Sequence, residues 1–134
     1  MRRNYISSSP ETKELLLKAA YVHPRHCETV PELQKLKEEM IHYVPFQGPL
    51  DRFITVLLGA GTKQGNSVGP HAHKGWTCVY YPFGAERIII QGNPYQPDID
   101  ELIVLPPGTE HEVPYTDIQR LSVAIVIATP EGAG

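Results

Sequence analysis

Residues 65–84 read GNSVGPHAHKGWTCVYYPFG, and this stretch decides how the rest of the chain is interpreted. It contains two histidines one residue apart, His71 and His73, followed by an aromatic and β-branched run that is typical of a strand. Side chains at positions i and i+2 of a strand point to the same face, so both imidazoles can reach one ion. Because imidazole suits divalent transition metals, the stretch predicts two ligands of a metal site.

A third ligand has to come from another strand, and His111 in LPPGTEHEV is the best candidate. The Pro-Pro-Gly turn before it predicts that His111 stands at the start of the next strand. The remaining histidines are poorer candidates, because they fall in a predicted loop or at the end of a predicted helix: His23, His26 and His42.

The rest of the chain predicts many short strands after a helical N-terminal segment. Its 134 residues include 13 prolines and 11 glycines, which suits short strands joined by turns. Two helices are expected: SPETKELLLKAA, with Ser9 as its cap and Pro10 in its first turn, and TVPELQKLKEEMIHYV, with Thr29 as its cap and Pro31 after it. The strand-like runs are RFITVLLGAG, WTCVYYP, ERIIIQG, ELIVL and RLSVAIVIA.

Composition excludes several partner classes. The formal charge is −3 and no basic run is present, so no nucleic-acid partner is expected. No segment approaches the roughly 18 apolar residues of a membrane span, and the first residues lack the apolar core of a secretory signal. Two cysteines are too few for a disulfide framework. A cytoplasmic protein is therefore expected.

The histidine segments resemble the two sequence motifs of the cupin family. The first motif is a glycine, five residues, H-x-H, three or four residues, a glutamate, six residues and a second glycine. Gly65, His71, His73 and Gly84 match this pattern, and Thr77 stands in place of the glutamate.

The second cupin motif is a glycine, five residues, P-x-G, two residues and a histidine. Asp100 stands at its glycine, Pro106 to Gly108 and His111 match the remainder, and Tyr115 replaces the asparagine that often closes it. The resemblance covers roughly residues 50–128.

The resemblance implies an all-β, cupin-type double-stranded β-helix, or jelly-roll barrel, with two short N-terminal helices. The expected single domain covers residues 1–134, with a helical segment at 1–45, the β-barrel at 46–128 and a loose tail at 129–134. Cupins are often dimers, so a homodimer is expected.

Thr77 is the informative departure from the family pattern, because the glutamate of that motif is a metal ligand in cupins. Its replacement leaves a neutral site of His71, His73 and His111, which resembles the thiol and diketone dioxygenases that hold Fe(II) in this way. We therefore predict one divalent ion, Fe(II) in preference to Mn, Ni, Co or Zn, in an oxygenase that acts on a small polar or anionic molecule. The alternatives are a non-redox metal cupin, such as an isomerase or lyase, and a ligand-binding or sensory cupin without turnover.

Strand parity assigns the neighbouring residues to two faces. Thr77, Val79 and Tyr81 share the face of the histidines, whereas Cys78 and Tyr80 face the other way. Thr77 and Tyr81 are the candidate catalytic groups, with the Tyr81 hydroxyl as a proton donor or an orienting group. Cys78 has the spacing of the cross-linked cysteine of thiol dioxygenases, but parity favours a plain buried cysteine.

The last predicted strand has a small, polar face and a bulky, apolar one. Arg120, Ser122 and Ala124 alternate with apolar residues, and the small face is expected inside the barrel. The C-terminal segment also resembles Fe(II)/2-oxoglutarate oxygenases, in which a basic residue after the last histidine binds the oxoglutarate carboxylate. Arg120 is thus a candidate substrate-binding residue. The 2-oxoglutarate co-substrate itself is not favoured, because His73 stands where those enzymes have a carboxylate.

Overall fold

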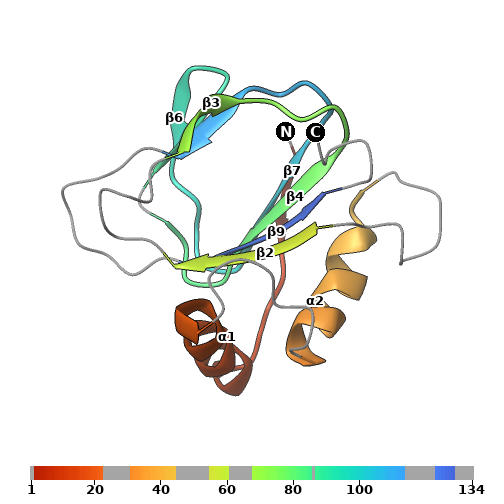
Figure 1. Ribbon diagram of the computed structural model, residues 1–134, viewed down its shortest axis with the longest axis vertical. Coiled ribbons are helices and arrows are strands. Elements are labelled where there is room, and N and C mark those ends of the chain that lie inside the picture. The colour runs from red at the N-terminus through yellow and green to blue at the C-terminus, as the bar shows by residue number, and fades with distance from the viewer. Residues whose placement is uncertain are drawn as a thin grey trace.

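The fold is a pair of facing antiparallel sheets with two helices against the outer side of the larger sheet (Figure 1). The computed structural model describes residues 2–22, 31–44, 55–60, 68–85, 87–113 and 123–128. No helix in these ranges is long and apolar enough to cross a membrane. The all-β class with two helices is the one that the sequence predicts.

The larger sheet has five strands, and every neighbouring pair in it is antiparallel. In order across the sheet these are β1 (Arg2–Tyr5), β7 (Glu101–Leu105), β4 (Thr77–Tyr81), β9 (Val123–Ala128) and β2 (Thr55–Ala60). The smaller sheet has four: β3 (Val68–His71), β8 (His111–Val113), β5 (Ile88–Ile90) and β6 (Asn93–Tyr95).

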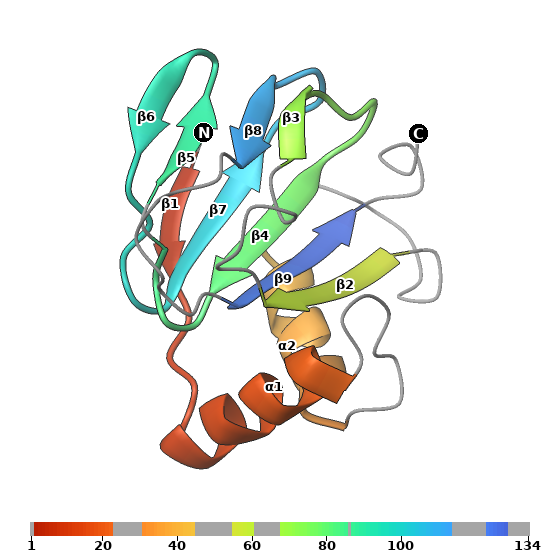
Figure 2. The same ribbon diagram turned by 60° about the vertical axis from the view of Figure 1, so that its left-hand side comes forward.

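The chain crosses between the two sheets at almost every connection after β2, which wraps it into a jelly roll. As a result, hydrogen-bonded neighbours are distant in sequence: β2 pairs with β9, β4 with β7 and β9, and β3 with β8 (Figure 2). All five strand-like runs of the sequence contain a strand of the structure. The strands β1 and β6 were not predicted.

Alternating side chains of the larger sheet pack into two separate hydrophobic cores: an outer core between this sheet and the helices, and an inner core between the two sheets. Cys78 and Tyr80 of β4 lie in the core between this sheet and the helices, whereas Val79 and Tyr81 lie in the core between the two sheets. Strand β9 alternates in the same way: Val123, Ile125 and Ile127 face the helices, whereas Ala124 and Val126 face the interior, so its inner face is not as uniformly small as predicted. The predicted alternation along β4 is therefore confirmed, but β4 is not the strand of the histidines, since His71 ends β3 in the smaller sheet. Burial on both faces also explains why runs such as TCVYY and ELIVL are almost wholly apolar.

The two helices begin as the sequence predicts. In α1 (Pro10–Val22), the backbone N–H of Thr12 donates to Ser9 Oγ at 3.1 Å, which makes Ser9 the N-cap and Pro10 the first helical residue. Helix α2 (Pro31–Ile41) places its apolar side chains one turn apart on the outer core. The predicted Thr29 cap lies outside the described residues.

Strand β1 lies within the segment that the sequence predicts as helical. Its residues, Arg-Arg-Asn-Tyr, carry no alternating apolar pattern that indicates a strand. The strand results from pairing with β7, whose edge it covers in the register Arg2 to Val104 through Tyr5 to Glu101. Tertiary context thus decides this element rather than local propensity.

A polar network centred on Asp100 ties the N-terminal segment to the barrel. Asp100 has φ +63°, a left-handed conformation that Asp tolerates and that explains why the cupin motif has glycine there. The Tyr80 hydroxyl donates to Asp100 Oδ1 at 2.6 Å and lies 2.7 Å from Ser8 Oγ, and Lys13 Nζ lies 3.1 Å from Asp100 Oδ2. The backbone N–H of Ile6 donates to the Asp100 carbonyl at 2.8 Å. Burial, followed by the bond to Asp100, raises the pKa of Tyr80 and keeps this hydroxyl a donor.

We predict measurable coupling between Tyr80 and Asp100. A double-mutant cycle of Tyr80→Phe and Asp100→Gly should give a coupling free energy of about 1.5 kcal/mol, because the hydrogen bond is to a charged group. Glycine suits the positive φ at position 100, so the cycle reports the side-chain contact rather than backbone strain. Urea unfolding of the four proteins measures it. Additive single variants would show that the contact between Tyr80 and Asp100 contributes nothing to stability.

Gly84, the second glycine of the first motif, leaves no room for a side chain, whereas Gly92 does. It has φ +70°, and a Cβ there would lie 3.0 Å from the Pro97 carbonyl oxygen. Gly92 has φ +78° but open space around it. Gly92→Ala should therefore cost only backbone strain of about 1–2 kcal/mol, and Gly84→Ala should cost clearly more. Thermal unfolding of the two variants tests this ranking, and equal losses would contradict it.

Candidate metal centre

His71 and His111 stand directly opposite each other on two paired strands. His71 is the last residue of β3, His111 is the first of β8, and the two are register partners. His111 is also the register partner of Ile90, which lies in the core between the sheets. Both imidazoles therefore face the barrel interior. The sequence prediction that the Pro-Pro-Gly turn delivers His111 to the start of a strand is confirmed.

His73 reaches the site from a connecting segment rather than from a strand. Strand β3 ends at His71, so the expectation that both residues of the H-x-H pair lie on one strand face is wrong in this detail. The His73 carbonyl accepts a 2.9 Å hydrogen bond from the N–H of Gly108, which holds this segment against the turn that precedes β8. The two turns that flank the site are thereby fixed to each other.

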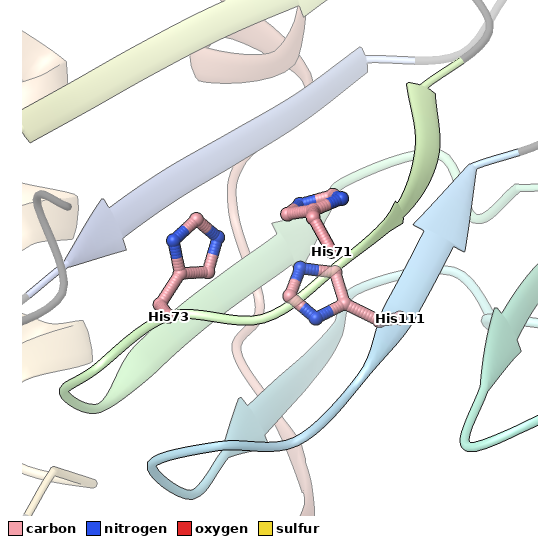
Figure 3. A group of neighbouring side chains, drawn as sticks. All are labelled: His71, His73 and His111. Atoms are coloured by element: carbon pink, nitrogen blue, oxygen red, sulfur yellow. The ribbon is translucent and has the colours of Figure 1, made fainter.

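The three imidazoles converge (Figure 3). Their ring centroids are 5.0 Å apart for His71 and His73, 4.2 Å for His71 and His111, and 5.2 Å for His73 and His111. One nitrogen of each ring lies within 4.8 Å of the corresponding nitrogens of the other two. Two nitrogens that each lie about 2.1 Å from one ion are at most about 4.2 Å apart, so the arrangement is close to what one metal requires.

Backbone carbonyls fix the orientation of two of the rings. Nδ1 of His71 lies 2.8 Å from the Gly69 carbonyl oxygen, and Nδ1 of His111 lies 2.9 Å from that of Thr109. A carbonyl can only accept, so Nδ1 carries the proton and Nε2 is left as the metal ligand. Burial lowers the pKa of His111; the bond to Thr109 opposes this shift and the neighbouring imidazoles add to it. The neutral, metal-binding form of His111 is therefore favoured.

Thr77 occupies the glutamate position of the motif and faces the interior. It is the first residue of β4, it is 2% exposed, and it shares its face with Val79 and Tyr81 of the inner core. In the described part of the chain, its buried hydroxyl has no hydrogen-bond partner. A buried polar atom without a partner at the glutamate position of the motif fits a site that is completed by a bound group.

The other sequence-predicted residues are not gathered at the histidines. Tyr81 lies four residues along β4 from Thr77, roughly 13 Å at the rise of a strand. It is the register partner of Glu101, and its pKa is raised by burial and then by the charge of Glu101. The proposed catalytic role of Tyr81 stays a prediction that this position does not favour. Cys78 is fully buried against helix α2, with Sγ 3.8 Å from the Met40 carbonyl oxygen.

Arg120 lies outside the described residues, so its predicted contact with a substrate stays a prediction.

The sequence interpretation did not predict one buried carboxylate, that of Glu101. Glu101 is fully buried and accepts hydrogen bonds from the Tyr95 hydroxyl and from the backbone N–H of Asp98, the latter at 2.8 Å. The sequence ELIVL could have predicted its burial, because Glu101 alternates in phase with Ile103 and Leu105, which lie in the inner core. Glu101 closes the end of the barrel away from the histidines.

Comparisons with known proteins give matches in shape alone. No protein-family model matches the chain, and no curated protein matches it. The plu4264 protein from Photorhabdus luminescens matches with 17% identity over 63% of this chain and 68% of that one, at a TM-score of 0.50. A salicylate 1,2-dioxygenase from Pseudaminobacter salicylatoxidans matches with 10% identity at the same score of 0.50, over 61% of this chain and only 22% of that one. A cupin protein from Bacteroides fragilis matches with 18% identity over 59% of this chain and 67% of that one, at 0.46.

At identities of 10–18%, these matches support the fold alone. The strand order describes a jelly roll of two facing antiparallel sheets, and the two matches at a TM-score of 0.50 support that fold. Together the fold and the cluster support a metal-binding site, with no indication of which ion it prefers. The chain therefore has the cupin fold.

Proposed function

We propose that the protein is a mononuclear metal-binding cupin that acts as an Fe(II)-dependent oxygenase on a small polar or anionic molecule. The observation that carries the proposal is the donor set: three inward-facing imidazoles, with Thr77 where a carboxylate ligand would complete the site. Three protein ligands leave positions on the ion for other molecules. The structural likeness to a salicylate 1,2-dioxygenase adds support at the level of the fold.

The residues of the chain have distinct roles in this proposal. His71 and His111 hold the ion through Nε2, and their Nδ1–H bonds to Gly69 and Thr109 keep both rings aimed at it. His73 supplies the third nitrogen. When bound, Fe(II) supplies activation of dioxygen and polarisation of a chelating substrate.

The inner wall beside the site is apolar. From Thr77 the inner face of β4 continues to Val79, whose register partners on the flanking strands are Ile103 and Val126. An apolar wall of this kind strengthens the electrostatic attraction between the ion and an anionic substrate. It also protects reactive species from water.

The same donor set favours a second candidate, a non-redox metal cupin such as an isomerase or lyase. Three neutral imidazoles suit zinc and nickel as well as iron, and such an ion acts as a Lewis acid. Consumption of dioxygen during turnover separates the two candidates. Retained affinity for a ligand without any turnover would instead indicate a binding or sensory cupin.

The metal content of the purified protein is the first test of this proposal. Protein prepared without added metal or chelator should hold close to one iron per chain, and His73→Ala should lose it. Outer partners of metal ligands already contribute about 10–100-fold in affinity, so removal of a ligand should cost at least 100-fold. His42→Ala is the matched control, because His42 is exposed and lies after helix α2. Equal metal content in all three proteins would show that His73 is not a ligand of the bound metal.

Oxygen uptake is the second test of this proposal. The Fe(II)-loaded protein should consume dioxygen with a member of a small panel: salicylate, thiols, diketones and 2-oxoglutarate. The zinc-loaded protein should be inactive with the same compound, because zinc has no redox chemistry. An oxygen electrode and product analysis measure both. Turnover that proceeds equally with zinc and without oxygen consumption would identify the Lewis-acid candidate.

A further inference from the structure

The charge of the site is not balanced by the protein ligands. In the described residues, the metal-ligating group consists of three histidines and contains no carboxylate. The printed sequence has no acidic residue between Asp51 and Glu86. Three neutral imidazoles leave a divalent ion with its full charge, and buried charges in proteins are normally paired. Among the described residues, no carboxylate belongs to the group that would balance this charge, which favours an anionic ligand at the ion.

The two acidic neighbours of His111 do not supply that charge. Glu110 is exposed, in the turn before β8. Glu112 is the register partner of Ile89, one residue from the inward-facing pair of His111 and Ile90, so it points to the outer face of the smaller sheet.

Thr77 offers a hydrogen-bond donor at the place where the motif has a carboxylate. Its hydroxyl is buried, lies on the inner face of β4 and has no partner among the described residues. Buried hydroxyls without a partner are uncommon in folded proteins, so this one is available to donate to a bound molecule.

The reach of a threonine suits this role. Oγ1 of a threonine is one bond from Cβ, as Cγ of a glutamate is, and the glutamate oxygens lie two bonds beyond Cγ, about 2.4 Å away. A hydrogen bond from a hydroxyl to an ionised oxygen is about 2.6 Å long. An external carboxylate oxygen held by Thr77 would thus occupy nearly the same point as the missing side-chain oxygen.

We propose that Thr77 is a specificity-determining residue: its hydroxyl donates a hydrogen bond to a carboxylate oxygen of the substrate, which takes the place of the missing glutamate at the metal. The inference rests on the proposed metal site and names the substrate class, a small carboxylate. Neutral molecules of the same shape bind weakly, because they leave the charge of the ion unbalanced. The substrate itself completes the site.

The test uses the full chain loaded with Co(II), whose visible absorption reports a change of ligands without any turnover. Acetate and salicylate should change the spectrum of the wild-type protein, and acetamide, the neutral counterpart of acetate, should not. Thr77→Val should weaken acetate binding by about tenfold or more, because a hydrogen bond to a charged oxygen is lost. Thr77→Ser should restore it. Thr77→Glu should hold Co(II) more tightly and lose the response to acetate.

Several outcomes would overturn the inference. Equal acetate affinity in the wild type and Thr77→Val would show that the hydroxyl does not touch the anion. A chloride response equal to that of acetate would remove the carboxylate assignment. Co(II) binding without a response to any of these anions would leave the metal site intact and reject the substrate class. Failure to bind Co(II) at all would reject the proposed function as well.

Thermal unfolding of the metal-free protein gives a second readout. If the Thr77 hydroxyl serves a ligand, Thr77→Val should raise the melting temperature, because an unpaired buried hydroxyl is replaced by an apolar group of the same shape. A lower melting temperature would mean that the hydroxyl stabilises the fold, and the assignment to substrate would fail.

Discussion

Strand β4 is buried on both faces, and this constraint governs the rest of the molecule. Each residue must serve one of two cores, so a shift of one position would exchange every inner side chain for an outer one. The strand lies between β7 and β9 with a defined register to each, which fixes the inner face of the whole larger sheet. Thr77 faces the interior because Cys78 and Tyr80 must face the helices. The chemistry of the site is thus a consequence of packing elsewhere on the same strand.

The metal centre combines local and long-range order. In both His71 and His111, Nδ1 bonds the carbonyl two residues earlier, an arrangement that the short segment can form by itself. The convergence of the rings depends instead on the pairing of β3 with β8 and on the bond between His73 and Gly108. The local part sets which nitrogen is free to bind. The long-range part brings the three nitrogens together.

The sequence predicted those features that repeat at short range. Parity placed Thr77 and Cys78 on opposite faces, and the turn before His111 predicted the strand start, because both depend on a few neighbouring residues. Strand β1 could not be predicted, since its conformation comes from the edge of β7. The role of Asp100 was also hidden, because it depends on partners from Ser8 to Tyr80 that only the fold assembles. Arg120 lies outside the described residues, and its place at the site stays a prediction.

The position of β9 has a consequence for how the molecule folds. This strand follows all the other described strands in sequence, yet it lies inside the larger sheet, between β4 and the edge strand β2. Until it inserts, β2 lacks its partner, and the outer core lacks Val123, Ile125 and Ile127. Folding of this kind is dominated by contacts between distant segments, which makes it slow and cooperative. Partly folded chains therefore expose the edge of β4, a natural target for pairing with another chain.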